Sequence, residues 1–203
     1  MRFSFMELKL MVSKRIKIAI IVVVVLIIGL FGTGATLSVI AQMEHVSDVQ
    51  VRNPEGTAGV AICVYQPGIS NFQEQVTNAI VDGLISNDFR VDITTASSQT
   101  PTDISNYDLL VLGSPTYGET PAQPVMNYLN RVGDLGGMAT VIIITAGGSG
   151  TQSADTMENS AQDANGVIVK TLIIYNLAPN EELYGTSDPL EIATNAGQEI
   201  LLP

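Results

Sequence analysis

Five short runs rich in Val, Ile and Leu recur along the chain, and stretches with helical periodicity separate them. Runs of this kind are typical of β-strands, and several of them are too apolar to have a solvent-facing side. Parallel strands need crossover connections, which intervening helices supply. The alternation therefore predicts an α/β fold with a doubly wound, five-stranded parallel sheet covered on both faces. The expected strands are residues 60–65, 90–96, 109–112, 139–145 and 167–175.

Helical spacing of apolar residues follows four of these strands. The first such pattern runs from Phe72 to Leu84, and Ser70 with Gln73 three residues later matches a capping box at its start. Further helices are expected to end near Val132, to cover about 154–164, and to begin at Asp188 and Pro189. Residues 58–203 are thus expected to form the folded domain.

The N-terminal part of the chain has a different composition. Residues 1–17 hold five of the nine Lys and Arg residues, and residues 18–42 carry no charge. Twenty or so apolar residues span a bilayer as a helix. We therefore expect a single transmembrane helix at 18–42, bound to membrane lipid, followed by a polar linker at 43–57. The basic flank places the N-terminus in the cytoplasm and the domain outside.

One alternative remains open for this segment, and one partner is possible if the segment is retained. Residues 39–41, Val-Ile-Ala, have the spacing of a signal-peptidase site, so cleavage near Ala41 would release a secreted protein. If the helix is retained, small residues four apart, such as Gly29 with Thr33 and Gly32 with Thr36, are compatible with a weak helix-mediated dimer.

The chain beyond residue 42 is strongly acidic. Of the 20 Asp and Glu residues, 19 lie there, against four of the nine Lys and Arg residues. Such a surface repels phosphate backbones, which excludes nucleic acid as a partner. It suits a basic partner protein or a high-salt setting.

Residues for acid–base, nucleophilic or metal chemistry are scarce in the domain. The single His45 precedes it, and the single Cys63 lies inside an apolar run, where a thiol is expected to be buried and inert. No histidine triad or zinc-type cluster can be assembled, so we expect no catalytic residue and no metal ligand. Redox chemistry in this chain would need a cofactor.

One stretch carries a family resemblance. Residues 107–118, YDLLVLGSPTYG, resemble the third strand and following loop of flavodoxins and related FMN-dependent reductases. The loop after the fourth strand, TAGGSG at 145–150, and the turn after the first strand match the family in position. The first turn, YQPGISNF at 65–72, departs from the family's hydroxyl-rich pattern, and only Ser70 and Asn71 remain there as side-chain ligands.

The resemblance implies an FMN site at the carboxyl ends of the strands. The phosphate would meet the first turn and the helix N-terminus, while the ring would lie between the second and third loops, with Tyr117 against its face. The implied contacts are Gly68, Ser70, Asn71, Ser114, Pro115, Thr116, Tyr117, Gly118, Ala146, Gly147 and Gly148.

The expected function is then a membrane-tethered flavodoxin-like electron carrier that binds FMN and passes electrons to a basic redox partner protein. An electron-transfer flavoprotein is favoured over a substrate-converting oxidoreductase, because no basic pocket for a nicotinamide phosphate is evident. Two alternatives stay open. One is an FMN-dependent quinone or NAD(P)H reductase, and the other is an interaction module of flavodoxin shape that has lost its cofactor.

Overall fold

The computed structural model describes residues 18–25 and 42–202 of the 203-residue chain, which divides into two compact units at residues 39 and 40. In the first unit, residues 18–25 are helical, with exposed side chains. Among the described residues, no helix has both the length and the apolar character needed to cross a bilayer. Residues 26–41 of the expected transmembrane segment, which include the small-residue pairs and Ala41, lie outside the described residues.

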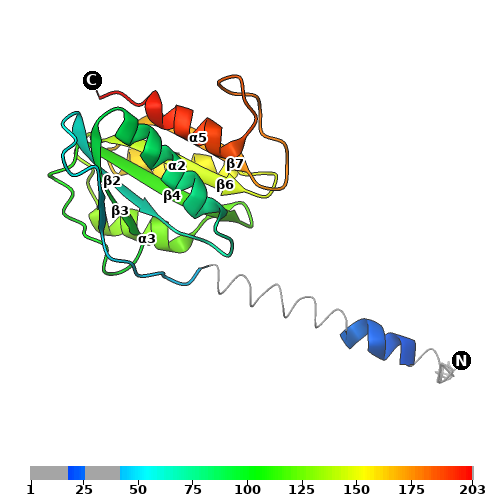
Figure 1. Cartoon of the computed structure of the whole chain (residues 1–203). Helices are drawn as coiled ribbons and strands as arrows, with labels where there is room; N and C mark the ends of the chain where they lie inside the picture. The colour runs from blue at the N-terminus through cyan, green and yellow to red at the C-terminus, as the bar shows by residue number, and fades with distance from the viewer. Residues whose placement is uncertain (1–17, 26–41, 203) are drawn as a thin grey trace, which may run out of the picture. The chain divides into compact units, whose positions relative to one another are not determined.

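The second unit alternates strands and helices along the chain (Figure 1). Its elements are β1 Gln50–Arg52, β2 Gly59–Tyr65, α2 Phe72–Ser86, β3 Phe89–Thr95, β4 Leu109–Tyr117, β5 Thr120–Pro121, α3 Gln123–Val132, β6 Ala139–Ala146, α4 Thr151–Asp163, β7 Val167–Tyr175 and α5 Pro189–Gln198. The sheet order is β1-β3-β2-β4-β6-β7, with β5 paired to β4. Pairing from β3 to β7 is parallel, as the alternation predicted.

Over residues 42–202 the sheet has seven strands and not the expected five. The strand β1 lies within the segment expected as a linker and pairs antiparallel with the edge strand β3. The second addition, β5, forms a hairpin with the end of β4. Both additions escape sequence analysis because they are only three and two residues long and carry no apolar run.

Residues 42–49 also lie against the domain. The Ser98 N–H donates to the Glu44 carboxylate at 2.9 Å, and the Thr95 N–H donates to the Ser47 hydroxyl at 3.0 Å. The Gln66 amide donates to the Met43 carbonyl at 2.9 Å. These bonds hold the segment before β1 along the carboxyl ends of β2 and β3.

Both faces of the sheet are covered. The odd-numbered residues Leu109 and Val111 of β4 pack in a core with α2 and α5, while Leu110 and Leu112 pack in a second core with α3 and α4. Figure 1 shows α2 and α5 over one face and α3 over the other. A strand with every side chain buried has no polar positions, which explains the continuous apolar run that predicted it.

The two helices on one face touch through glycine. A Cβ added to Gly83 of α2 would lie 2.8 Å from the Cα of Gly197 in α5, and it would also overlap the carbonyl oxygen of Thr194. Backbone atoms cannot yield as a flexible side chain would. The absence of a side chain at Gly83 is therefore what lets α2 and α5 pack side by side.

We expect Gly83→Ala to lower the free energy of unfolding by about 1–3 kcal/mol, because the added methyl group forces the two helices apart. Urea denaturation of the full chain measures this. The matched control is Gly147→Ala, since a Cβ at Gly147 meets its nearest neighbour, Leu177, at an ordinary 3.8 Å. Equal stability of the two variants would contradict the close helix contact.

Candidate functional site

Three chain segments meet at the carboxyl ends of β2, β4 and β6. The parallel register pairs Tyr65 with Gly113, and Pro115 with Thr145, so the segments that follow these strands lie side by side. A cavity of about 150 Å³ lies between them. Its lining residues are Ile69, Ser70, Phe72, Pro115, Thr116, Tyr117, Thr145, Ala146, Gly147, Asn176 and Leu177. We call it the strand-end cavity.

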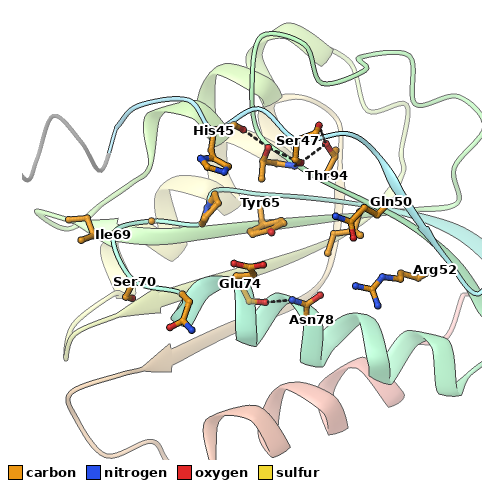
Figure 2. Close-up of a pocket in the computed structure, with 15 residues that line it drawn as sticks. His45, Ser47, Gln50, Arg52, Tyr65, Ile69, Ser70, Glu74, Asn78 and Thr94 are labelled. Atoms are coloured by element: carbon orange, nitrogen blue, oxygen red, sulfur yellow. Dashed lines mark hydrogen bonds between the residues drawn. The ribbon is translucent and has the colours of Figure 1, made fainter.

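Six of the eleven residues implied by the resemblance line this cavity, from all three segments. Gly68 and Asn71 do not; together with Ser70 they line a second cavity, which Figure 2 draws. Ser114, Gly118 and Gly148 do not line the strand-end cavity either.

The segment expected as the second loop is part of β4. Residues Ser114 and Pro115 continue the ladder with β6, and Thr116 and Tyr117 pair with β5. The Ser114 hydroxyl donates to the Pro115 carbonyl at 2.9 Å and accepts from the Ala122 N–H at 2.8 Å. These bonds fix the β4–β5 hairpin, and Ser114 is fully buried beneath it.

Tyr117 reaches from this hairpin to the first turn. The Ile69 N–H donates to the Tyr117 hydroxyl at 2.9 Å. A Cβ on Gly68 would lie 2.8 Å from the same hydroxyl, and the φ of +82° at Gly68 also favours glycine. Burial raises the pKa of Tyr117, and the Ile69 N–H works in the opposite direction. The phenol is therefore neutral at pH 7 and contacts one of the turn's backbone donors.

The N-terminus of α2 opens beside this turn without a side-chain cap. Asn71 occupies the N-cap position but its side chain makes no capping bond. The expected capping box is wrong, since Ser70 accepts only from the Phe72 N–H, at 3.4 Å, and Gln73 points into the protein. Uncapped N–H groups and the helix dipole attract anions.

Gln73 instead joins α2 to the sheet. Its side chain is 1% exposed, and it accepts from the Thr145 hydroxyl at 2.7 Å and donates to the Thr77 hydroxyl at 3.0 Å. A Cβ at Gly113 would lie 2.8 Å from the Gln73 amide nitrogen, so glycine makes room for it. This buried network fixes the position of the α2 N-terminus relative to β6.

One polar atom of the strand-end cavity lacks a partner within the described part of the chain. The Thr116 Oγ1 is buried and makes no hydrogen bond. Buried hydroxyls are seldom left in this state, because the lost hydration costs about 1–3 kcal/mol. A ligand or an ordered water at this position would satisfy it.

Asn176 and Leu177 complete the cavity and were not anticipated. Their N–H groups donate to the carbonyls of Ala146 and Gly147 at 2.9 and 3.1 Å, and Leu177 is 86% exposed. The pairing of Ala146 with Tyr175 carries them there. The signal in the sequence was the end of the fifth apolar run, which places the next residues beside the fourth strand's loop.

Among the described residues, no charged side chain lines the strand-end cavity. Cys63 is fully buried, and burial raises the pKa of its thiol, which leaves it unreactive. The arrangement offers backbone N–H groups, hydroxyls and an aromatic ring. It can bind a polar, partly planar ligand, but its described residues provide no general acid or base.

We expect Thr145→Val to destabilise the protein by about 1–3 kcal/mol, because it leaves the buried Gln73 carbonyl oxygen without its donor. Adding Gln73→Leu to this variant removes the orphaned group and is expected to recover part of the loss. Denaturant unfolding of the two single variants and the double variant gives the coupling energy. If the stability losses of the two single variants simply add in the double variant, the hydrogen bond between Thr145 and Gln73 is not formed.

Solved structures with the same fold include a flavodoxin from the domain Archaea, at TM-score 0.55 and 16% identity, covering 69% of this chain and 94% of that one. Megasphaera elsdenii flavodoxin gives TM-score 0.52 at 17% identity, covering 68% and 98%. An NAD(P)H:quinone oxidoreductase from Methanothermobacter marburgensis gives 0.52 at 15%, covering 70% and 99%. Neither a protein-family model nor a curated protein matches the sequence. The predicted α/β architecture is thus confirmed as a flavodoxin-like fold.

Proposed function

We propose that this protein is an electron carrier that binds FMN at the strand-end cavity. The observation that supports this most directly is the meeting of an uncapped helix N-terminus with the buried, unpartnered Thr116 hydroxyl at one cavity. The cavity lies outside the carboxyl ends of the strands, where open α/β sheets bind their ligands.

The polar groups suit FMN in kind. The phosphate would be held by the N–H groups at the start of α2 and by Ser70, with Asn71 beside them. The Thr116 hydroxyl and the backbone of Gly147 and Gly148 would meet the polar edge of the ring, and Tyr117 would contact its face. When bound, FMN would supply the one-electron and two-electron chemistry that the side chains lack.

The cavity must widen before a flavin ring enters. Its 150 Å³ falls below the roughly 300 Å³ at which ligand pockets usually begin. The Tyr117 hydroxyl also engages the Ile69 N–H, one of the backbone donors beside the phosphate position. Movement of Tyr117 off the turn would enlarge the cavity and free that donor together.

A carrier fits the cavity better than a substrate-converting enzyme. In the part of the chain that the structure describes, no Lys, Arg or His lines it to bind a nicotinamide phosphate, so we rank an NAD(P)H or quinone reductase lower. The acidic residues of the domain would attract a basic redox partner, at rates that fall as salt rises.

A second function is favoured by one contact. If the Tyr117–Ile69 hydrogen bond closes the site permanently, the domain serves as an interaction module that has lost its cofactor. The same bond therefore distinguishes the two functions by experiment.

We further propose that residues 18–42 tether the domain to the outer side of the cell membrane. This rests on the sequence alone: the uncharged segment and the basic residues before it. Secretion after cleavage near Ala41 is the alternative.

We expect the full chain, purified in detergent, to bind added FMN, and Tyr117→Phe to bind it about two- to tenfold more tightly. The phenylalanine ring keeps the flat face but releases the Ile69 N–H. Tyr117→Ala is expected to bind about two- to tenfold more weakly than Tyr117→Phe, because it also loses the ring. Quenching of flavin fluorescence measures all three. Absence of binding by both the wild type and Tyr117→Phe would favour the cofactor-free module.

Membrane tethering is tested by fractionation. The full chain is expected in the membrane fraction, resistant to carbonate wash, and a chain starting at Gln42 is expected in the soluble fraction. The intact mass of the extracted protein identifies the mature N-terminus. A mass that matches a chain starting near Gln42 would overturn the tether in favour of secretion.

A further inference from the structure

A second and larger cavity lies on the α2 face of the sheet and shares Ile69 and Ser70 with the strand-end cavity (Figure 2). Its volume is about 390 Å³, within the usual range for small-molecule sites. It is bounded by α2, by the turn at 67–71, and by the segment that contains His45, Ser47 and β1. We call it the β1 cavity.

The strand β1 creates this cavity. Gln50 pairs with Ile93 and Arg52 with Val91, and opposed residues of an antiparallel pair project to the same face of the sheet. Val91 and Ile93 belong to the core beneath α2 and α5. The side chains of Gln50 and Arg52 therefore stand on the α2 face and form the wall opposite the helix.

Arg52 is distinct among the four basic residues of the domain. Arg90 pairs with Asp92 at 3.3 Å and Lys170 with Glu199 at 2.7 Å, and Arg131 donates to the carbonyls of Ser97 and Ser98. Within the described part of the chain, Arg52 makes no ion pair or side-chain hydrogen bond. Among the described Lys and Arg residues, Arg52 is thus the one left available to a ligand there.

Glu74 lines the same cavity from α2, and its carboxylate also has no ion-pair partner among the described residues. The two opposite charges thus share a cavity without meeting each other. Figure 2 shows Glu74 and Asn78 on the α2 side, with Arg52 approaching from β1. A molecule that carries both a carboxylate and an ammonium group would pair with each of them.

Tyr65 forms the floor between these charges. Its side chain is only 8% exposed, and no hydrogen bond to its hydroxyl is formed by the described residues. Burial, and then the charge of Glu74, raise the pKa of Tyr65 to about 12, so the phenol keeps its proton. The hydroxyl is accessible from the cavity and can bond a polar ligand that fills it.

We propose that the β1 cavity binds a small zwitterion of the α-amino acid or short-peptide class. The ligand carboxylate would meet Arg52, its ammonium group would meet Glu74, and Tyr65 and Asn78 would bond its polar atoms. At roughly 30 Å³ per water, the cavity has the volume of about a dozen water molecules, which suits a ligand of similar heavy-atom number. This site goes beyond the proposed function and does not require FMN.

A simple anion fits these residues less well. Glu74 stands at the cavity, and the domain around it is acidic, so a ligand with only negative charge would be repelled. A simple cation would in turn be repelled by Arg52. Only a ligand that carries both charges satisfies both side chains.

The first test is calorimetric titration of the full chain in detergent with L-glutamine and with glycylglycine. Two analogues of glutamine control for each charge: 4-carbamoylbutanoate lacks the ammonium group, and 4-aminobutanamide lacks the carboxylate. We expect glutamine to bind and each analogue to bind at least about tenfold more weakly, which is the usual effect of losing one charged hydrogen bond. Absence of binding by both zwitterions, or equal binding by 4-carbamoylbutanoate, would overturn the proposal.

The second test uses charge variants. Arg52→Gln and Glu74→Gln are expected to weaken glutamine binding about tenfold, and the charge reversal Arg52→Glu with Glu74→Arg is expected to restore part of it. Glu182→Gln, an exposed change in a distant loop, is the control and is expected to bind as the wild type does. Wild-type affinity in both single variants would contradict the site. Arg52 lies outside both the strand-end cavity and the first turn of α2, so the FMN titration of Arg52→Gln separates the two proposals.

Discussion

The doubly buried parallel strands β2, β4 and β6 determine where this domain can bind a ligand. Their side chains alternate between two cores, so neither face of the central sheet is open to solvent. Parallel pairing then brings their carboxyl ends to one edge, and the polar backbone that follows each strand must collect there. The uncapped α2 N-terminus, the β4–β5 hairpin and the Gly147–Gly148 loop are neighbours for this reason.

Sequence analysis predicted the core strands because a strand that is buried on both faces has a continuous run of apolar residues in the sequence. It missed β1 because Gln50–Arg52 is exposed and is held by pairing to β3, some 40 residues further along the chain. It also ended β4 too early, at Leu112. Residues 113–117 have the composition of a loop, and only their pairing with β6 and β5 keeps them extended. Long-range pairing of this kind has no local signature.

The candidate site was likewise predicted only in part. Its position at the strand ends followed from the order of the elements, and six implied residues do line one cavity. The roles of individual side chains could not be predicted from the order of the elements. Gln73 has the spacing of a capping residue, yet its partner is Thr145, 72 residues away. The Ser114 hydroxyl, expected to face a ligand, is used by the Ala122 N–H of its own hairpin. The hydrogen-bond partner of such a side chain depends on which buried groups lack partners once the chain has folded.

The turn at 67–71 connects the two cavities physically. Ile69 and Ser70 line both of them, and the Ile69 N–H is the donor that Tyr117 engages. Movement of Tyr117 off the turn would change the wall of the β1 cavity as well as the volume of the strand-end cavity. Where two binding sites are coupled, the coupling free energy is reciprocal. If FMN and a zwitterion bind as proposed and each shifts this turn, each would alter the affinity of the other by the same factor.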